Sequence, residues 1–78
     1  MKIITYIDIN NITHEIQYAN NIISIDLYYC HITEITYIYN LSNLQILNLS
    51  GNKITEIKGL DTLVNLDYLD LSNNMGKG

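Results

Sequence analysis

The chain is 78 residues long, carries a formal net charge of −4, and contains no arginine, proline, tryptophan or phenylalanine. A chain of this length forms one small domain at most and hides only about 60% of its unfolded surface on folding. Nucleic-acid binding requires clustered basic groups that neutralise phosphates. The lysines are scattered along the chain, so we expect no nucleic-acid partner.

The first segment, residues 1–21, begins with alternating apolar and polar residues in MKIITYIDINN. A secretory signal would require an unbroken apolar run of about 7–15 residues, and a membrane helix about 20. The segment offers neither, so we expect a cytoplasmic protein without a membrane partner. Aligning INNITHEI with CHITEI places Asn10 level with Cys30. Because this copy is shortened and carries an extra residue between Ile12 and Ile16, residues 1–21 are predicted to be a degenerate repeat that caps a stack.

Two copies of a twenty-two-residue pattern follow, at residues 22–43 and 44–65, and every aligned apolar position is apolar in both. Each copy begins with the in-and-out alternation of a strand, as in Leu47–Asn48–Leu49. Each unit is too small to bury its own apolar face, so we expect the units to stack into a parallel sheet.

The second half of each copy has apolar residues at every third position. In the first copy these residues are Ile32, Ile35, Ile38 and Leu41. An α-helical stripe would mix spacings of three and four, so a strict spacing of three indicates either 3₁₀ turns or an extended return arm.

A third copy starts at residue 66 and ends at Asn74. The pattern then requires an apolar residue at position 76, but the chain continues with MGKG, and residues 75–78 are predicted to be a flexible tail. The strand within residues 66–74 would lack a return arm and a polar cap. We therefore expect this C-terminal edge either to self-associate or to be completed by further repeats.

LQILNLSGNKITEIKGLDTLVN, residues 44–65, resembles a leucine-rich repeat and is similar to the repeats of phosphatase-regulating nuclear proteins and bacterial internalins. The signature L-x-x-L-x-L-x-x-N/C-x-L is met by residues 44–54, by residues 22–32 with isoleucine and cysteine, and up to Asn74 by residues 66–74. The resemblance implies an α/β solenoid with short parallel strands, 3₁₀ or extended convex arms, and little regular α-helix.

The N/C position of this family turns inward after the strand and bonds to the turn backbone, so the resemblance places Cys30, Asn52 and Asn74 on a structural ladder. Asparagine supplies a donor and an acceptor where unpaired peptide groups are costly. Cysteine is small, tolerates burial and donates weakly. Neither a second cysteine nor a well-spaced histidine accompanies Cys30, so we expect it to be a structural rung without a metal or redox role.

Parallel strands place equivalent residues side by side, so the outward strand positions are predicted to form three rows on a concave face. The rows are Ser24, Ile46 and Tyr68; Asp26, Asn48 and Asp70; and Tyr28, Ser50 and Ser72, with Ile4, Tyr6 and Asp8 as candidates to lead them. Aromatic anchors among polar groups suit protein recognition. The alternative is a merely solvated sheet face, because tyrosine and β-branched residues also fit strands for structural reasons.

No group of residues in the sequence indicates catalysis. His14 and His31 are expected to be exposed turn residues, and a catalytic histidine would need an orienting partner and a reacting group within reach. Glu34 and Glu56 recur one repeat apart and are predicted to form a solvated row. The Gly-Lys pair near the end lacks the first glycine and the Ser/Thr of a phosphate-binding loop. We expect no enzyme, no cofactor and no metal.

The favoured function is a non-catalytic module that binds another protein through the concave face. The resemblance implies intracellular scaffolding or regulatory binding. Two alternatives stay open: an internalin-like adhesion segment of an exported protein, and a truncated leucine-rich repeat fragment with no independent function.

Overall fold

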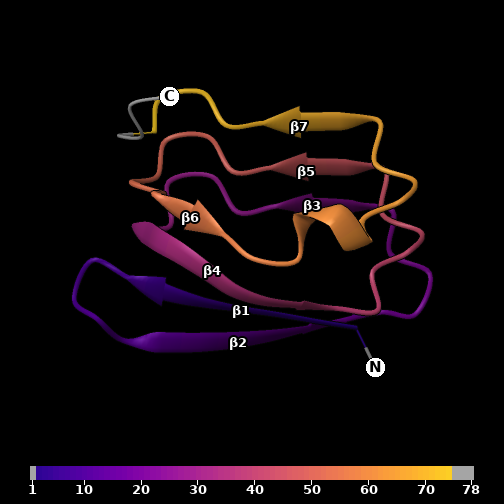
Figure 1. Cartoon of the computed structure of the whole chain (residues 1–78), viewed down its shortest axis with the longest axis horizontal. Helices are drawn as coiled ribbons and strands as arrows, with labels where there is room; N and C mark the ends of the chain where they lie inside the picture. The colour runs from indigo at the N-terminus through magenta and orange to yellow at the C-terminus, as the bar shows by residue number, and fades with distance from the viewer. Residues whose placement is uncertain (1, 75–78) are drawn as a thin grey trace.

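The computed structural model describes residues 2–74, and the predicted tail at residues 75–78 lies outside them. The described chain folds into two sheets (Figure 1). One sheet has the strand order β3-β5-β7 and contains β3 (Ser24–Asp26), β5 (Ile46–Asn48) and β7 (Tyr68–Asp70). The other has the order β2-β1-β4-β6 and contains β1 (Lys2–Asp8), β2 (Thr13–Tyr18), β4 (Ile32–Tyr39) and β6 (Glu56–Ile57).

The three-stranded sheet follows the repeat seen in the sequence. Its strands are parallel, and each residue pairs with the residue twenty-two positions later, as Ile25 does with Leu47 and Leu47 with Leu69. Ile25 and Leu47 point inward and are buried, while their neighbours on each strand are partly or fully exposed. The short parallel strands expected from the alternation are therefore confirmed.

The first return arm is the extended strand β4, which pairs antiparallel with β1 and parallel with β6. Its pairing with β1 skips Thr36 and then Thr33, because the register shifts twice along the pair. A β-bulge inserts one extra residue and moves the next side chain to the same face. Two bulges therefore allow Ile32, Ile35 and Ile38, spaced by three, all to face the core, where each is 7% exposed or less.

The two bulged threonines also replace lost backbone hydrogen bonds. The Thr33 hydroxyl donates to the carbonyl oxygen of Ile7 at 3.0 Å, and the Thr36 hydroxyl donates to that of Thr5 at 3.2 Å. Each hydroxyl thereby gives a partner to a β1 carbonyl beside a bulge.

The second return arm combines the short strand β6 with the 3₁₀ helix η1 (Leu60–Thr62). Gly59 precedes this helix with a φ of 88°, and a Cβ at this position would lie 3.3 Å from Cβ of Ile38. Both the left-handed backbone and the close approach favour glycine here. Among the described residues η1 is the only helix, which confirms the expectation of little regular α-helix.

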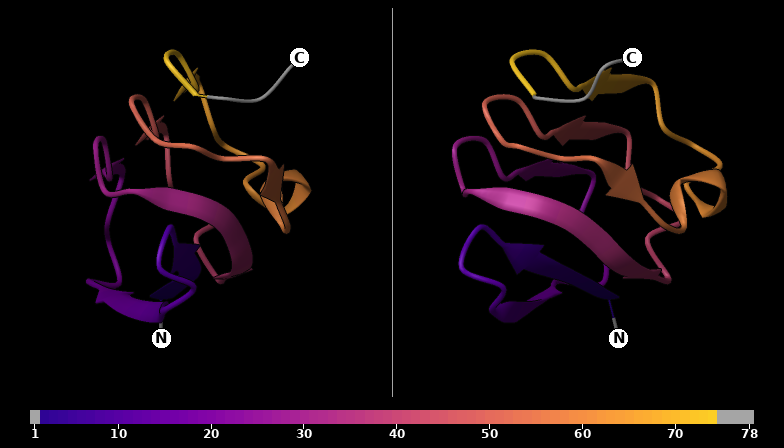
Figure 2. Two further views of the ribbon diagram at one scale, coloured as in Figure 1. Left: turned by 90° about the vertical axis from the view of Figure 1, so that its left-hand side faces the viewer. Right: turned by 60° about the vertical axis from the view of Figure 1, so that its left-hand side comes forward.

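Residues 2–18 depart from the predicted repeat. They form an antiparallel hairpin, β1 with β2, and join the sheet of the return arms instead of leading the parallel sheet (Figure 2). The expectation that Ile4, Tyr6 and Asp8 lead the three rows is wrong, since β1 lies in the other sheet. Ile4 and Tyr6 are buried against the core. Asn10 is exposed in the hairpin turn, so its predicted place on the ladder is also wrong.

One apolar core links the two sheets. Its most deeply buried side chains come from the hairpin, the first return arm and the middle repeat: Ile4, Ile32, Ile35, Leu44, Leu47 and Leu49. The two sheets are short and neither closes on itself, so the described residues show stacked repeats but do not by themselves show a solenoid.

Candidate functional site

The side chain of Asn52 connects two neighbouring repeats and is only 2% exposed. Its Oδ1 accepts hydrogen bonds from the backbone N–H groups of Cys30 at 2.8 Å and Ile32 at 3.1 Å. Its Nδ2 donates to the carbonyl oxygens of Leu27 at 3.0 Å and Leu49 at 2.9 Å. One amide therefore satisfies peptide groups in the turn of its own repeat and in the turn of the preceding one.

Asn74 repeats this arrangement one layer later. Its Oδ1 accepts from the Ile54 N–H at 2.9 Å, and its Nδ2 donates to the carbonyl oxygens of Leu49 at 3.0 Å and Leu71 at 2.9 Å. Cys30 makes much weaker use of the same position, since its thiol donates only to the Tyr28 carbonyl at 3.5 Å. Burial raises the pKa of the Cys30 thiol, with a smaller contribution from Asp26, and this favours the protonated and less reactive form.

The outward residues of β3, β5 and β7 and the residues two positions after the end of each strand form what we call the outer sheet face. It comprises Ser24, Asp26, Tyr28, Ile46, Asn48, Ser50, Tyr68, Asp70 and Ser72, the nine residues expected to bind a partner. Ser24, Ile46 and Tyr68 lie level with one another, as do Asp26, Asn48 and Asp70. Tyr28, Ile46 and Tyr68 are 51%, 41% and 56% exposed, so large apolar groups lie open on this face.

The middle row of the outer sheet face also has a local structural task. The Oδ1 atoms of Asp26, Asn48 and Asp70 each accept the backbone N–H two residues later, at 3.3, 3.0 and 2.9 Å. The Ser72 hydroxyl also donates to Asp70 at 2.7 Å. These bonds from Ser72, first from its hydroxyl and then from its N–H, lower the pKa of Asp70. The Asp70 carboxylate is thus held in place, and its lowered pKa favours the ionised form.

Tyr29 stands at the end of this face in an unusual backbone conformation. Its φ is 54°, and the equivalent residues of the next repeats, Gly51 and Asn73, also have positive φ. The Tyr29 ring lies over Gly51, where a Cβ would collide with it, and edge-on to the Tyr28 ring at 5.5 Å. The sequence did not predict a left-handed backbone at Tyr29, because bulky residues rarely adopt this conformation.

A groove of about 480 Å³ adjoins the N-terminal ends of the three strands. It is lined by side chains that recur with the repeat and by two apolar neighbours: Asn21, Asn43 and Asn65; Ile23, Gln45 and Asp67; and Val64 and Leu66. This groove was not predicted from the sequence. The recurrence of asparagine at positions 21, 43 and 65 is the signal that could have found it.

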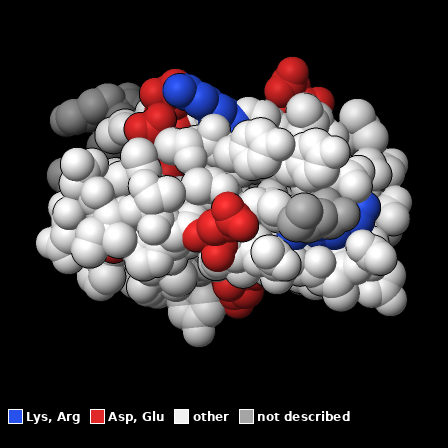
Figure 3. Space-filling model, turned by 90° about the horizontal axis from the view of Figure 1, so that it is seen from below, with Lys and Arg blue, Asp and Glu red and all other residues white. Residues whose placement is uncertain are grey.

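The acidic and basic side chains are distributed unevenly among the elements. Lys58 lies on the return arms, where its Nζ is 3.8 Å from Glu34 and 4.0 Å from Glu56. None of the nine residues of the outer sheet face is basic. On the side of the molecule shown in Figure 3, lysine atoms lie at separate places and do not form one patch.

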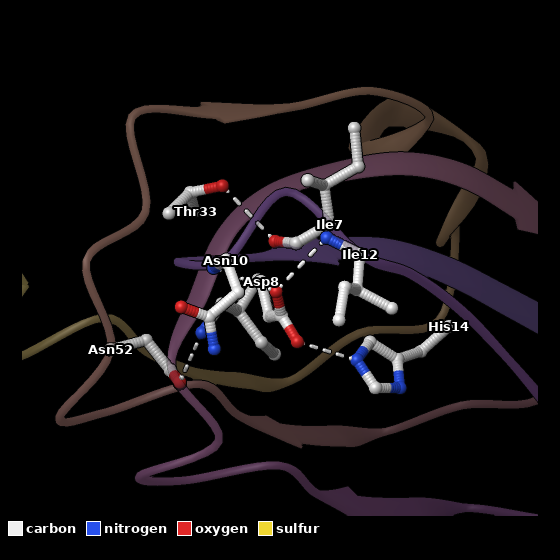
Figure 4. A network of polar contacts seen from close by, with 8 residues as sticks. Ile7, Asp8, Asn10, Ile12, His14, Thr33 and Asn52 are labelled. Carbon is white, nitrogen blue, oxygen red and sulfur yellow. Dashed lines mark hydrogen bonds and ion pairs between the residues drawn. The ribbon is translucent and has the colours of Figure 1, made fainter.

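The hairpin contains a second polar cluster (Figure 4). His14 Nε2 lies 2.7 Å from Asp8 Oδ2, and the Tyr6 ring stacks on the His14 ring with centroids 4.7 Å apart. Asp8 Oδ1 accepts the N–H groups of Asn10 and Ile12, and the bond with His14 is the main cause of the lowered pKa of Asp8. The expectation that His14 is an exposed turn residue is therefore wrong, since it lies in strand β2. These contacts hold the hairpin turn, and we see no reacting group beside them.

His31, by contrast, is exposed in the loop directly before β4 and has a φ of 60°. Within residues 2–74, no three histidine, cysteine or acidic side chains come together in a way that could hold a metal ion. The same part of the chain contains no helix of the length and apolarity needed to span a membrane.

Comparison with known families gives one result. The model of a family described as leucine-rich repeats (2 copies) matches residues 4–62 and again residues 42–75. No curated protein and no solved structure matches the chain.

Proposed function

This chain belongs to the leucine-rich repeat family, and from that premise we propose that it is a non-catalytic module that binds another protein through the outer sheet face. Repeats of this family generally mediate protein–protein interaction. The observation that carries the proposal for this chain is the exposure of Tyr28, Ile46 and Tyr68 on a sheet whose inner side is packed against the core. Aromatic anchors on a rigid support lose little entropy on binding.

We propose further that the partner presents basic groups to this face. Asp26 and Asp70 lie on one row beside the exposed tyrosines, and the face carries no lysine to neutralise them. A lysine or arginine of the partner could pair with a carboxylate and rest on a tyrosine ring. Complementary charge of this kind supports specificity and the rate of association.

The proposal also includes the finer assignments made from the sequence. Residues 22–43, 44–65 and 66–74 are taken as successive repeats of a solenoid, with residues 1–21 as its N-terminal cap. The exact twenty-two-residue register of β3, β5 and β7 supports this division. We place the module in the cytoplasm, in keeping with the free thiol of Cys30.

The repeats themselves supply conservative substitutions for a test. Serine stands one repeat away from Tyr28, at Ser50, and Tyr68 is level with Ser24. The double variant Tyr28→Ser/Tyr68→Ser should therefore keep the fold. We expect it to lose partners that the immobilised parent chain captures from extracts of its source cells.

The matched control is Tyr37→Ser/Tyr39→Ser, which removes two tyrosines of similar exposure from β4, outside the outer sheet face. This variant should capture the same partners as the parent. For the charge, Asp26→Asn/Asp70→Asn keeps the Oδ1 acceptors, as Asn48 already does, and should weaken capture. Equal capture by the parent and the Tyr28→Ser/Tyr68→Ser variant would reject the outer sheet face as the binding site.

A further inference from the structure

A second groove, of about 460 Å³, lies where the described repeats end, between the second return arm and the turn after β7. Its lining residues are Ile54, Thr55, Glu56, Ile57, Leu60, Leu71 and Asn74. The lining is mainly aliphatic, and Leu71 is 40% exposed there. This groove shares no residue with the outer sheet face.

Each of the seven lining residues has an equivalent twenty-two positions earlier in the chain. These equivalents are Ile32, Thr33, Glu34, Ile35, Ile38, Leu49 and Asn52. The aliphatic residues and the asparagine among them are all 7% exposed or less. The same surface therefore exists one layer earlier in the molecule, and there it is covered.

The chain's own second return arm covers that earlier surface. β6 runs parallel to β4, with Ile57 level with Ile35. The N–H groups of Lys53, Thr55 and Lys58 donate to carbonyl oxygens of the first arm at 2.9–3.0 Å. The structure thus shows how a surface of this composition is occupied: by an extended arm whose apolar residues recur at every third position.

We propose that the second groove binds an extended segment of another polypeptide that has the pattern of residues 54–63, with isoleucine or leucine at every third position, running parallel to β6. The bound segment would pair with the edge of β6 and pack on the aliphatic floor of the groove, as β6 itself pairs with β4 and covers its isoleucines one layer earlier. This binding surface is independent of the proposed function, since the two faces use different residues.

Charge adds a requirement for the occupant. In the covered layer, Lys58 of the arm reaches Glu34 of the layer beneath it, at 3.8 Å. The residue of the groove equivalent to Glu34 is Glu56, whose side chain is 57% exposed. An occupant with lysine at the position of Lys58 would meet Glu56 in the same way. The segment ITEIKGLDTLVN, residues 54–65, has this lysine and is the natural probe.

The test is fluorescence anisotropy of a labelled synthetic ITEIKGLDTLVN peptide titrated with the full chain. We expect saturable binding of the peptide. Replacing the three peptide residues that correspond to Ile54, Ile57 and Leu60 with asparagine should weaken the affinity about tenfold or more. Changing the peptide lysine to glutamate should also weaken binding. The chain variant Leu71→Lys should lose binding, whereas Val64→Lys, at a position 74% exposed outside this groove, should not.

Circular dichroism of each chain variant would verify the fold, and the Tyr28→Ser/Tyr68→Ser variant should bind the peptide as the parent does. Equal binding by the Leu71→Lys variant or by the asparagine peptide would overturn the proposal. If the chain dimerises in sedimentation experiments and the peptide cannot reverse this dimerisation, the occupant is a second copy of the chain instead. Binding that appears only after deletion of residues 75–78 would assign the groove to the chain's own end, and would also overturn it.

Discussion

At the scale of single residues, the amide of Asn52 forms hydrogen bonds with the turns of two successive repeats. Replacement by leucine would leave the N–H groups of Cys30 and Ile32 and the carbonyl oxygen of Leu27 without this partner, at a position where Asn52 is 2% exposed. The Leu49 carbonyl oxygen would keep the bond from Asn74. A buried polar group without a partner costs about 1–3 kcal/mol. We predict that Asn52→Leu lowers the free energy of unfolding by about 2–4 kcal/mol, measured by urea denaturation.

The matched control for this prediction is Cys30→Ala, at the same position of the preceding repeat. Its thiol makes one long hydrogen bond, and the Cys30 N–H is satisfied by Asn52. The hairpin beneath Cys30 has no repeat turn whose peptide groups would need an asparagine. This explains why cysteine is tolerated there. Similar losses of stability in the two variants would contradict a special role for the Asn52 amide.

Tyr18 gives a prediction for alkaline solution. Burial, followed by the proximity of Cys30 and Tyr6, raises the pKa of Tyr18 to about 12. Its pKa in the unfolded chain is near the ordinary value of about 10. The folded state therefore holds the Tyr18 proton where the unfolded state has lost it, so this contribution to stability is complete below pH 10 and is lost as the pH rises towards 12.

Thermal melting between pH 8 and pH 11 tests this expectation, with the pH range set by the ordinary tyrosine pKa of about 10. The Tyr18→Phe variant should lose less stability than the parent over that range. Tyr37→Phe, which removes a hydroxyl from an exposed ring, should follow the parent. If the parent and the Tyr18→Phe variant lose stability in parallel, the Tyr18 hydroxyl is not responsible.

At the scale of the elements, the bulged strand β4 explains why the spacing of three did not distinguish a 3₁₀ arm from an extended arm. Both conformations bring every third side chain to one face, the 3₁₀ helix by its own period and β4 by its two bulges. The chain uses both solutions, since the second arm contains η1. The sequence therefore predicts which side chains are buried but not which backbone buries them.

The bulges lead to a test that uses two equivalent threonines. The Thr33 hydroxyl donates to Ile7 in the neighbouring strand β1 at 3.0 Å, whereas the Thr55 hydroxyl is exposed and its bond is 3.4 Å long. We predict that Thr33→Val lowers the free energy of unfolding by about 1 kcal/mol, because a carbonyl beside the bulge loses its partner. Thr55→Val should change it little in the same denaturation experiment. A neutral Thr33→Val would show that the hydroxyl does not stabilise the bulge.

The hairpin is the element that alignment with the repeat misplaced. Residues 2–8 and 13–18 both alternate in the manner of strands, and the residues between them include Asn10 and Asn11, a pair that favours a turn. Asn11 adopts the positive φ of 63° that such a turn requires. Two short alternating runs around this turn were a sufficient signal for a hairpin. Residues 1–21 match the twenty-two-residue pattern only in part, because they contain this hairpin.

At the scale of the whole molecule, the sequence predicts best what the repeat dictates. The parallel register and the inward residues of β3 and β5 follow from a side-chain period that neighbouring copies share. The pairing of β1 with β4 joins residues about thirty positions apart that have no common pattern, so no periodicity could predict it. The outer sheet face follows from the repeat, while the second groove depends on how an arm covers the layer before it.

The two sheets share one apolar core, and this should make the molecule unfold as a unit. Ile4 of the hairpin sheet and Leu47 of the parallel sheet are each 1% exposed and belong to the same buried cluster. Replacing a buried isoleucine or leucine with alanine costs about 2–5 kcal/mol, a large part of the 5–15 kcal/mol typical of a folded domain. We predict that Ile4→Ala and Leu47→Ala each shift one common melting transition.

Circular dichroism reports the strands of both sheets, and tyrosine fluorescence reports rings on both, including Tyr18 on β2 and Tyr68 on β7. For a domain of this size, each kcal/mol should lower the melting temperature by about 4–8 °C. We expect the two signals to change together in both variants, because neither sheet can bury its apolar side without the other. A parallel sheet that persists after the hairpin of Ile4→Ala has melted would contradict the shared core, and would show that the repeats are stable without their N-terminal hairpin.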